Sequence, residues 1–310
     1  MRLGVLILPS HRWSEARRCW RLADEAGFAH AWTYDHITWR DLAGSPWYAS
    51  TPTLAAAAEA TGRLQLGALV TTPNFRHPVP FAKEVCTLGD LSDDRFVLGV
   101  GAGAGGADAG VLGGEPGPGD RMARFAEFTE LLDILLREPV VDFSGRFYCA
   151  RQAGIDPTGR AASTIPLAVA ASGPRSMRLA ARFGDVWVTN GTSPAPGRVA
   201  PSVAPEVVAD QLRRLEEACD AEGRDFAGMR KLLLNVDRRR PPLASLEAFR
   251  DAFGTYRELG MTDMVIPFPR TQPPFVADFG VFEAVIGEFL SAGTPDADAI
   301  RRSAERCRER

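Results

Sequence analysis

Eight short apolar runs alternate with eight amphipathic stretches along the chain, and no other feature constrains the fold as strongly. Nearly continuous apolar runs are typical of parallel strands that are covered on both faces. Strict alternation of strand and helix predicts an α/β protein, specifically a (β/α)8 TIM barrel. A doubly wound sheet stays open as an alternative, because alternation alone does not determine closure. The predicted strands are 3–8, 31–34, 64–71, 96–100, 166–171, 186–190, 232–236 and 264–268. The predicted helices are 13–26, 54–61, 81–91, 121–137, 176–183, 206–222, 246–259 and 279–290.

Composition and length narrow the class of protein further. The chain has 310 residues and a formal net charge of −3, so we expect neither a nucleic acid nor an anionic membrane as a partner. We expect one barrel domain over 1–294 with insertions at its C-terminal mouth, at 139–164 and 192–205, and a charged tail at 295–310. No apolar run reaches the length of a membrane span. The five cysteines form no CxxC pair, which predicts reduced thiols in a cytoplasmic protein and no metal site.

A stretch of twenty-one residues that begins in the fourth predicted strand contains ten glycines. Residues 101–106 match the G-x-G-x-x-G dinucleotide fingerprint, but that motif must lead directly into a helix. Here glycines and prolines continue, so we expect no helix before about Arg121. We interpret the stretch as a loop at the barrel mouth. Without bulky side chains, Gly101, Ala102 and Gly103 are expected to line the face of a planar cofactor.

Catalytic side chains of TIM barrels lie at the C-terminal ends of the strands. The second predicted strand ends in Asp35-His36, and Trp39 follows. A neutral imidazole exchanges protons near pH 7, so His36 is a candidate general acid or base. Asp35 is a candidate to orient it or to bond a cofactor ring, and Trp39 to close an aromatic wall. The alternative is a histidine satisfied by the backbone at the rim. Adjacent strand residues point to opposite faces, which argues against a shared metal ion.

The fifth predicted strand leads into Ser172-Gly173-Pro174-Arg175-Ser176, where a helix begins. Unpaired backbone N–H groups, two hydroxyls and a guanidinium at a helix N-terminus predict a phosphate site. The alternative is an ordinary cap, in which Ser172 or Ser176 bonds its own helix. Phosphate binding is favoured because a cap requires neither Gly173 nor Arg175.

Together these segments resemble the bacterial luciferase-like monooxygenase superfamily, which contains FMN-dependent monooxygenases and oxidoreductases that use the deazaflavin coenzyme F420. The resemblance extends over nearly the full chain. It rests on the motifs at 35–36, 70–78, 95–103, 171–174 with 179–185, and 256–260. It implies a TIM barrel with the active site at the C-terminal mouth, and a possible homodimer.

The resemblance also implies roles for particular residues. The flavin-like ring is expected to lie across the third and fourth strands. Family members carry a non-prolyl cis peptide there, and the matching bond is Leu69–Val70, so that Leu69, Val70 and Thr71 are expected to contact the cofactor. The histidine that matches His36 is the usual acid or base of the F420 branch, and a tryptophan near Trp39 often lies beside it. The serine-glycine segment described above would hold the cofactor phosphate.

Three functions are compatible with the resemblance, and we favour the first of them over the other two. The first is an F420-dependent oxidoreductase that transfers hydride between the deazaflavin C5 and a C=C, C=N or C=O bond of a small molecule. The second is an FMN-dependent monooxygenase that uses reduced flavin and O2, and the third is a flavin-binding protein without catalysis. Sugar-phosphate dehydrogenases of the F420 branch have a glutamate where this chain has Ala104, which argues against a sugar-phosphate substrate.

Overall fold

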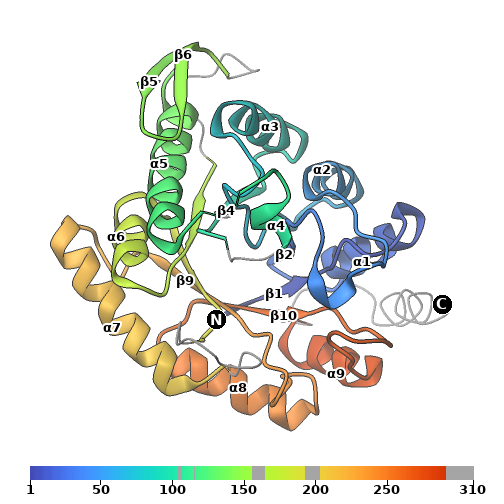
Figure 1. Cartoon of the computed structure of the whole chain (residues 1–310). Coiled ribbons are helices and arrows are strands. Elements are labelled where there is room, and N and C mark those ends of the chain that lie inside the picture. The colour runs from blue at the N-terminus through green and yellow to red at the C-terminus, as the bar shows by residue number, and fades with distance from the viewer. Residues whose placement is uncertain (104–106, 115, 156–164, 193–202, 291–310) are drawn as a thin grey trace.

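The computed structural model describes residues 1–103, 107–114, 116–155, 165–192 and 203–290. Eight parallel strands of these residues close into a barrel in the order β1-β10-β9-β8-β7-β4-β3-β2, which confirms the predicted TIM barrel and excludes the open sheet. Figure 1 shows the strands at the centre with the helices around them. The barrel strands are β1 (Arg2–Leu6), β2 (His30–Thr33), β3 (Gln65–Ala68), β4 (Phe96–Val100), β7 (Leu167–Ala170), β8 (Val186–Thr189), β9 (Arg230–Leu234) and β10 (Asp263–Pro267).

Each predicted helix is present, and several begin at a proline. Proline is favoured in the first turn because its missing N–H would have no helical partner there. None of the described helices combines the length and apolarity needed to cross a membrane. The helices are α1 (Trp13–Glu25), α2 (Ser50–Ala60), α3 (Pro78–Leu91), α4 (Ala107–Gly110), α5 (Pro118–Arg137), α6 (Pro174–Phe183), α7 (Pro205–Glu222), α8 (Leu246–Glu258) and α9 (Phe279–Phe289), with a 3-10 turn η1 (Arg40–Leu42) after β2.

Two apolar clusters make up the core. The larger one fills the space between the barrel and its helices, and the smaller one fills the barrel itself. Trp32 is fully buried in the smaller cluster, and Gly67 on the next strand makes room for it. A Cβ at Gly67 would lie 2.4 Å from Cζ3 of Trp32. The barrel is therefore a packed core, and only its two ends offer space for polar chemistry.

A buried polar cluster closes the end of the barrel where the strands begin. Nε2 of His30 lies 2.9 Å from Oδ1 of Asp263, and the indole N–H of Trp32 donates to Nδ1 of His30 at 2.7 Å. Arg2 and Arg230 donate to the same carboxylate at 2.8 and 3.0 Å. Burial lowers the pKa of His30. Burial alone would raise the pKa of Asp263, but hydrogen bonds from His30 and Arg230 outweigh it and lower this pKa.

These two pKa shifts predict that acidification destabilises the fold. Below about pH 6.5 an unfolded histidine takes up a proton, whereas His30 stays neutral in the fold. Below about pH 3.9 an unfolded aspartate also takes up a proton, whereas Asp263 stays ionised. The unfolded chain thus binds more protons in both windows, so the free energy of unfolding falls as pH falls. The urea midpoint of unfolding, measured at several pH values between about 7.5 and 5, is expected to fall as the pH falls. A His30→Gln variant with the same slope as the wild type would contradict it.

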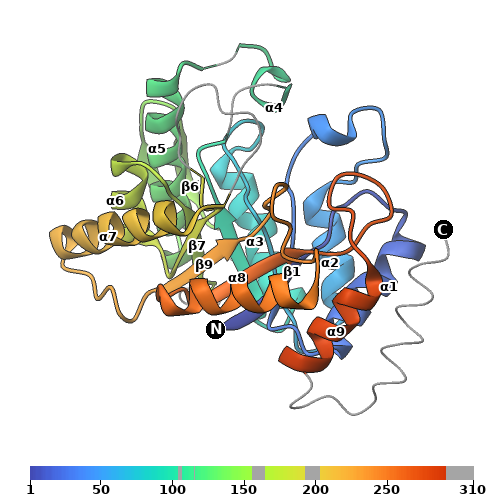
Figure 2. The same cartoon turned by 90° about the horizontal axis from the view of Figure 1, so that it is seen from below.

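The glycine-rich stretch after β4 differs from the prediction. It contains α4, a single helical turn, and α5 begins at Pro118 rather than Arg121. Local propensity does not predict α4, because glycines lie on both sides of it. Tertiary contacts stabilise it instead, since Asp108 of α4 bonds the loop after β2. Figures 1 and 2 place α4 over one end of the barrel, on the same side as the loop that follows β2.

The predicted mouth insertion at 139–164 is also corrected. Its described part forms a hairpin of β5 (Val141–Ser144) and β6 (Cys149–Ala153), which lies at the outer edge of the barrel beside α5 and not across the mouth (Figure 1). The carboxylate of Glu127 on α5 anchors the hairpin turn by accepting three backbone N–H groups, those of residues 146, 147 and 148. Most of the second insertion (193–202), the segment 156–164 and the tail after 290 lie outside the described residues.

Candidate active site

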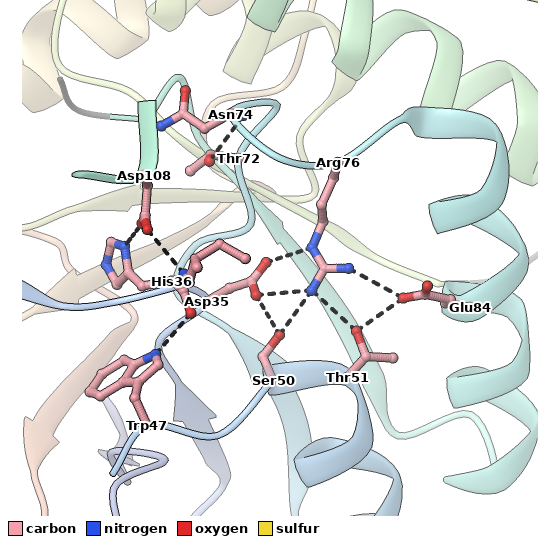
Figure 3. A network of polar contacts seen from close by, with 11 residues as sticks. Asp35, His36, Trp47, Ser50, Thr51, Thr72, Asn74, Arg76, Glu84 and Asp108 are labelled. Atoms are coloured by element: carbon pink, nitrogen blue, oxygen red, sulfur yellow. Dashed lines mark hydrogen bonds and ion pairs between the residues drawn. The ribbon is translucent and has the colours of Figure 1, made fainter. Parts of the chain in front are cut away.

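His36 lies at the mouth end of β2 and is bound by a carboxylate from another loop (Figure 3). Its side chain is 32% exposed, and its Nδ1 forms a hydrogen bond with Oδ2 of Asp108 on α4. Oδ1 of Asp108 accepts the backbone N–H groups of Ile37 and Thr38 at 3.0 and 3.2 Å. We did not predict Asp108. A signal for it exists in the sequence, because it is the only charged residue between 96 and 114.

Asp35 does not orient His36, so the first of its two predicted roles was wrong, whereas its contact with a cofactor stays a prediction. Its carboxylate accepts two bonds from the guanidinium of Arg76, at 2.8 and 2.9 Å, and one from the hydroxyl of Ser50 at 2.6 Å (Figure 3). Neighbouring residues of an extended chain point to opposite sides, which separates Asp35 from the ring of His36. Burial alone would lower the pKa of Arg76, but the carboxylates of Asp35 and Glu84 raise it. This buried ion pair joins the end of β2 to the loop after β3.

Trp39 belongs to an aromatic cluster beside His36. Its ring centroid lies 5.1 Å from that of Tyr34, 5.6 Å from Trp47 and 6.1 Å from Phe275. Trp47 also donates its indole N–H to the backbone carbonyl of His36 at 2.8 Å (Figure 3). The cluster forms an apolar wall along one side of the histidine.

The loops after β3 and β4 form a surface of small residues at the mouth. The Leu69–Val70 peptide is cis, as the resemblance implies. A Cβ at Gly101 would lie 2.4 Å from Cγ2 of Val70, and one at Gly103, where φ is +73°, would lie 2.7 Å from Nδ2 of Asn74. Only glycine therefore allows these two loops to approach so closely.

Exposure differs among the residues predicted to contact the cofactor on these two loops. Val70, Ala102 and Gly103 remain partly exposed, whereas Leu69 is buried inside the barrel. Thr71 is buried and pairs with β4, since its N–H donates to Gly99 and its carbonyl accepts from Gly101. Ala104 lies outside the described residues.

The segment from Ser172 to Ser176 begins α6, and part of it is an ordinary cap. The hydroxyl oxygen of Ser176 accepts the backbone N–H groups of Ser172 and Gly173, both at 3.2 Å, and donates to the carbonyl of Gly173 at 3.0 Å. Those two N–H groups are not unpaired, contrary to the prediction. Pro174 and Arg175 are exposed, and a Cβ at Gly173 would meet nothing within 4 Å. The segment thus presents open space and one exposed guanidinium toward the solvent.

A TIM barrel with a histidine–carboxylate pair and a surface of small residues at its mouth is the arrangement expected for the luciferase-like class. The chain belongs to the luciferase-like monooxygenase family, whose family model matches residues 1–234.

Curated relatives of this chain are named F420-dependent glucose-6-phosphate dehydrogenases. The one from Beutenbergia cavernae is 41% identical over 170 residues, which is 54% of this chain and 49% of the relative. The one from Intrasporangium calvum is 36% identical over 226 residues, 70% of this chain and 64% of the relative. The chain thus spans about half to somewhat under two thirds of their length. A similar solved structure is an F420-dependent secondary alcohol dehydrogenase with an F420–acetone adduct. The superposition has a TM-score of 0.75 at 18% sequence identity and covers 95% of this chain and 99% of the dehydrogenase chain. This similarity supports the fold.

Proposed function

We propose that the protein is an F420-dependent oxidoreductase, in which His36 is the proton donor or acceptor for a small organic substrate. The observation that carries the proposal is the state of the imidazole. Asp108 holds its Nδ1, and Nε2 has no hydrogen-bond partner among the described residues. A partly exposed ring with one engaged nitrogen and one available nitrogen can exchange a proton at the mouth. The names of the curated relatives support F420 as the cofactor.

The residues present fit a planar cofactor with a phosphate. Val70, Ala102 and Gly103 offer a partly exposed surface without large side chains. Arg175 has no ion-pair partner among the described residues and lies at the start of α6, where the helix dipole also favours an anion. When bound, F420 supplies or accepts the hydride at C5.

Residues of the chain would transfer the proton and shield the site from water. In the oxidising direction, Nε2 of His36 takes the hydroxyl proton of an alcohol as its C–H hydride leaves and the C=O bond forms. In the reducing direction it returns the proton to the substrate oxygen. Trp39 and Trp47 shield one side of the histidine from water, which strengthens electrostatic interactions there.

A cavity of about 350 Å³ beyond Trp39 is the candidate space for the substrate. Phe275, which packs on Trp39, lines it together with five prolines and other apolar residues. Its charged groups include Asp41 and Arg238, which pair with each other. Asp237 also lines the cavity, so its lining holds two carboxylates and one guanidinium. An apolar wall with this excess of negative charge favours an uncharged organic substrate over a phosphate ester.

Titration of the protein with F420 and with FMN, followed by tryptophan fluorescence, tests the cofactor. We expect saturable binding of F420, and tight binding of FMN without binding of F420 would overturn the proposal. Turnover is then assayed from F420 absorbance, with isopropanol, cyclohexanol and glucose 6-phosphate as probes. F420 binding without turnover of any probe, in either direction, would favour the non-catalytic alternative.

An Arg175→Gln variant is expected to bind F420 about tenfold more weakly. One charge-assisted hydrogen bond to phosphate contributes about 1.5–3 kcal/mol, and solvent screening reduces this contribution at an exposed site. Its urea midpoint should equal that of the wild type, since the side chain is exposed. Ser176→Ala is the matched comparison at the same helix end. It removes the cap and should cost about 1 kcal/mol of stability. Unchanged F420 affinity in the Arg175 variant would place the phosphate elsewhere.

A further inference from the structure

We propose that Asp108 is a positioning residue that keeps the proton of neutral His36 on Nδ1, so that Nε2 is the ring nitrogen that exchanges protons. The inference rests on the proposed role of His36 and adds a residue from a different loop to it. The sequence separation is 72 residues, and α4 is the element that brings the two side chains together.

The two oxygens of Asp108 have different tasks. Oδ1 accepts the backbone N–H groups of Ile37 and Thr38, and Oδ2 faces Nδ1 of His36 (Figure 3). An ionised carboxylate only accepts hydrogen bonds, so Nδ1 must be the donor. In a neutral imidazole the other nitrogen then carries the lone pair. The Asp108 side chain is 11% exposed, which limits the competition of water for these bonds.

The carboxylate acts in both protonation states of the histidine. In the neutral state it selects the tautomer in which Nε2 can accept a proton. After proton uptake, its negative charge stabilises the imidazolium, as a buried aspartate does in hydrolase triads. The backbone bonds to Ile37 and Thr38 favour this orientation of the carboxylate, because rotation would exchange both of them for bonds to water.

An Asp108→Asn variant separates this role from simple packing. The amide nitrogen of asparagine cannot accept hydrogen bonds, so its oxygen must face the N–H groups of Ile37 and Thr38. The NH2 group then points at Nδ1 of His36, which becomes an acceptor, and the proton moves to Nε2. A substitution of nearly equal shape is therefore expected to invert the tautomer.

Long-range 1H–15N NMR on histidine-labelled protein without cofactor, at a pH where His36 is neutral, measures the tautomer directly. A His36→Gln variant assigns the signal. We expect the Nδ1–H form in the wild type and in Asp108→Glu, and the Nε2–H form in Asp108→Asn. The same tautomer in wild type and Asp108→Asn would overturn the inference. Asp120→Asn is the matched control. Asp120 is an exposed residue at the start of α5 that pairs with Arg146, and its substitution should leave the tautomer of His36 unchanged.

Kinetics give the second readout. With the fastest probe alcohol, kcat of Asp108→Asn is expected to fall roughly 10²-fold while KM and F420 affinity stay near wild type, because only proton exchange is impaired. A fall in F420 affinity with unchanged kcat would overturn the positioning role. If the tautomer inverts as expected while a His36→Ala variant keeps full turnover, the Asp108 assignment stands and the proposed function fails.

Discussion

A His36→Ala variant is expected to lose about 10²–10⁴-fold in turnover while it binds F420 as tightly as the wild type. The loss follows from the proposed role of the imidazole as the proton-exchanging group, which Asp108 and the aromatic cluster contact at the mouth. Water that replaces the ring would be neither oriented nor paired with the carboxylate. Steady-state rates from F420 absorbance, together with fluorescence titration, measure the two quantities separately.

The comparison variant for this experiment is His11→Ala. His11 is also a histidine on a loop after a strand, with a 46% exposed side chain that lies 3.7 Å from Glu15. Its removal should leave turnover within about twofold, since surface substitutions are usually close to neutral. Full turnover in His36→Ala would remove the proton-exchange role. Loss of F420 binding in that variant would instead assign His36 to the cofactor site.

An Asp263→Asn variant is expected to lose about 1–3 kcal/mol of unfolding free energy, because donors of a buried cluster then lack an acceptor and the partly exposed Arg2 and Arg230 lose their counter-charge. The Asp263 side chain is fully buried and accepts bonds from His30, Arg2 and Arg230, and from the hydroxyl of Thr262 at 2.6 Å. Asparagine removes the charge and replaces one acceptor oxygen by a donor, which then faces other donors. Urea unfolding at neutral pH measures the loss.

Asp210→Asn is the matched control for the same chemical change at an exposed site. Asp210 pairs with Arg213 and Arg214 on the surface of α7, with its side chain 41% exposed. Exposed ion pairs contribute about 0–1 kcal/mol, so this variant should unfold close to the wild type. Equal losses in the two variants would show that burial of the Asp263 cluster does not set its contribution to stability.

The periodicity of the sequence predicted the barrel well. All eight barrel strands and the eight outer helices lie where alternation placed them, because parallel strands covered on both faces are nearly continuous apolar runs. The errors are confined to segments without such a period. The hairpin of β5 and β6 and the single turn of α4 are held by contacts with α5 and with the loop after β2. Neither contact produces a periodic pattern in the sequence.

The residues of the candidate site were likewise predicted only in part. The rule that catalytic groups follow barrel strands selected His36 and Trp39 as candidates, and their catalytic roles stay predictions. The same rule could not identify the carboxylate that bonds His36. Asp35 is adjacent to His36 in sequence but bonds Arg76, whereas Asp108 is distant in sequence and bonds His36. The cap on Ser176 likewise depends on the turn of the chain at α6.

By itself the sequence determined the barrel, its mouth and the histidine at the end of β2, because these follow from the order of apolar runs along the chain. Tertiary structure alone decided which carboxylate reaches that histidine and which nitrogen it engages. A hydrogen bond depends on distance and direction between side chains of separate loops, and neither quantity is encoded in the spacing of residues within one loop. The carboxylate that serves His36 therefore comes from α4, the element that local propensity did not predict.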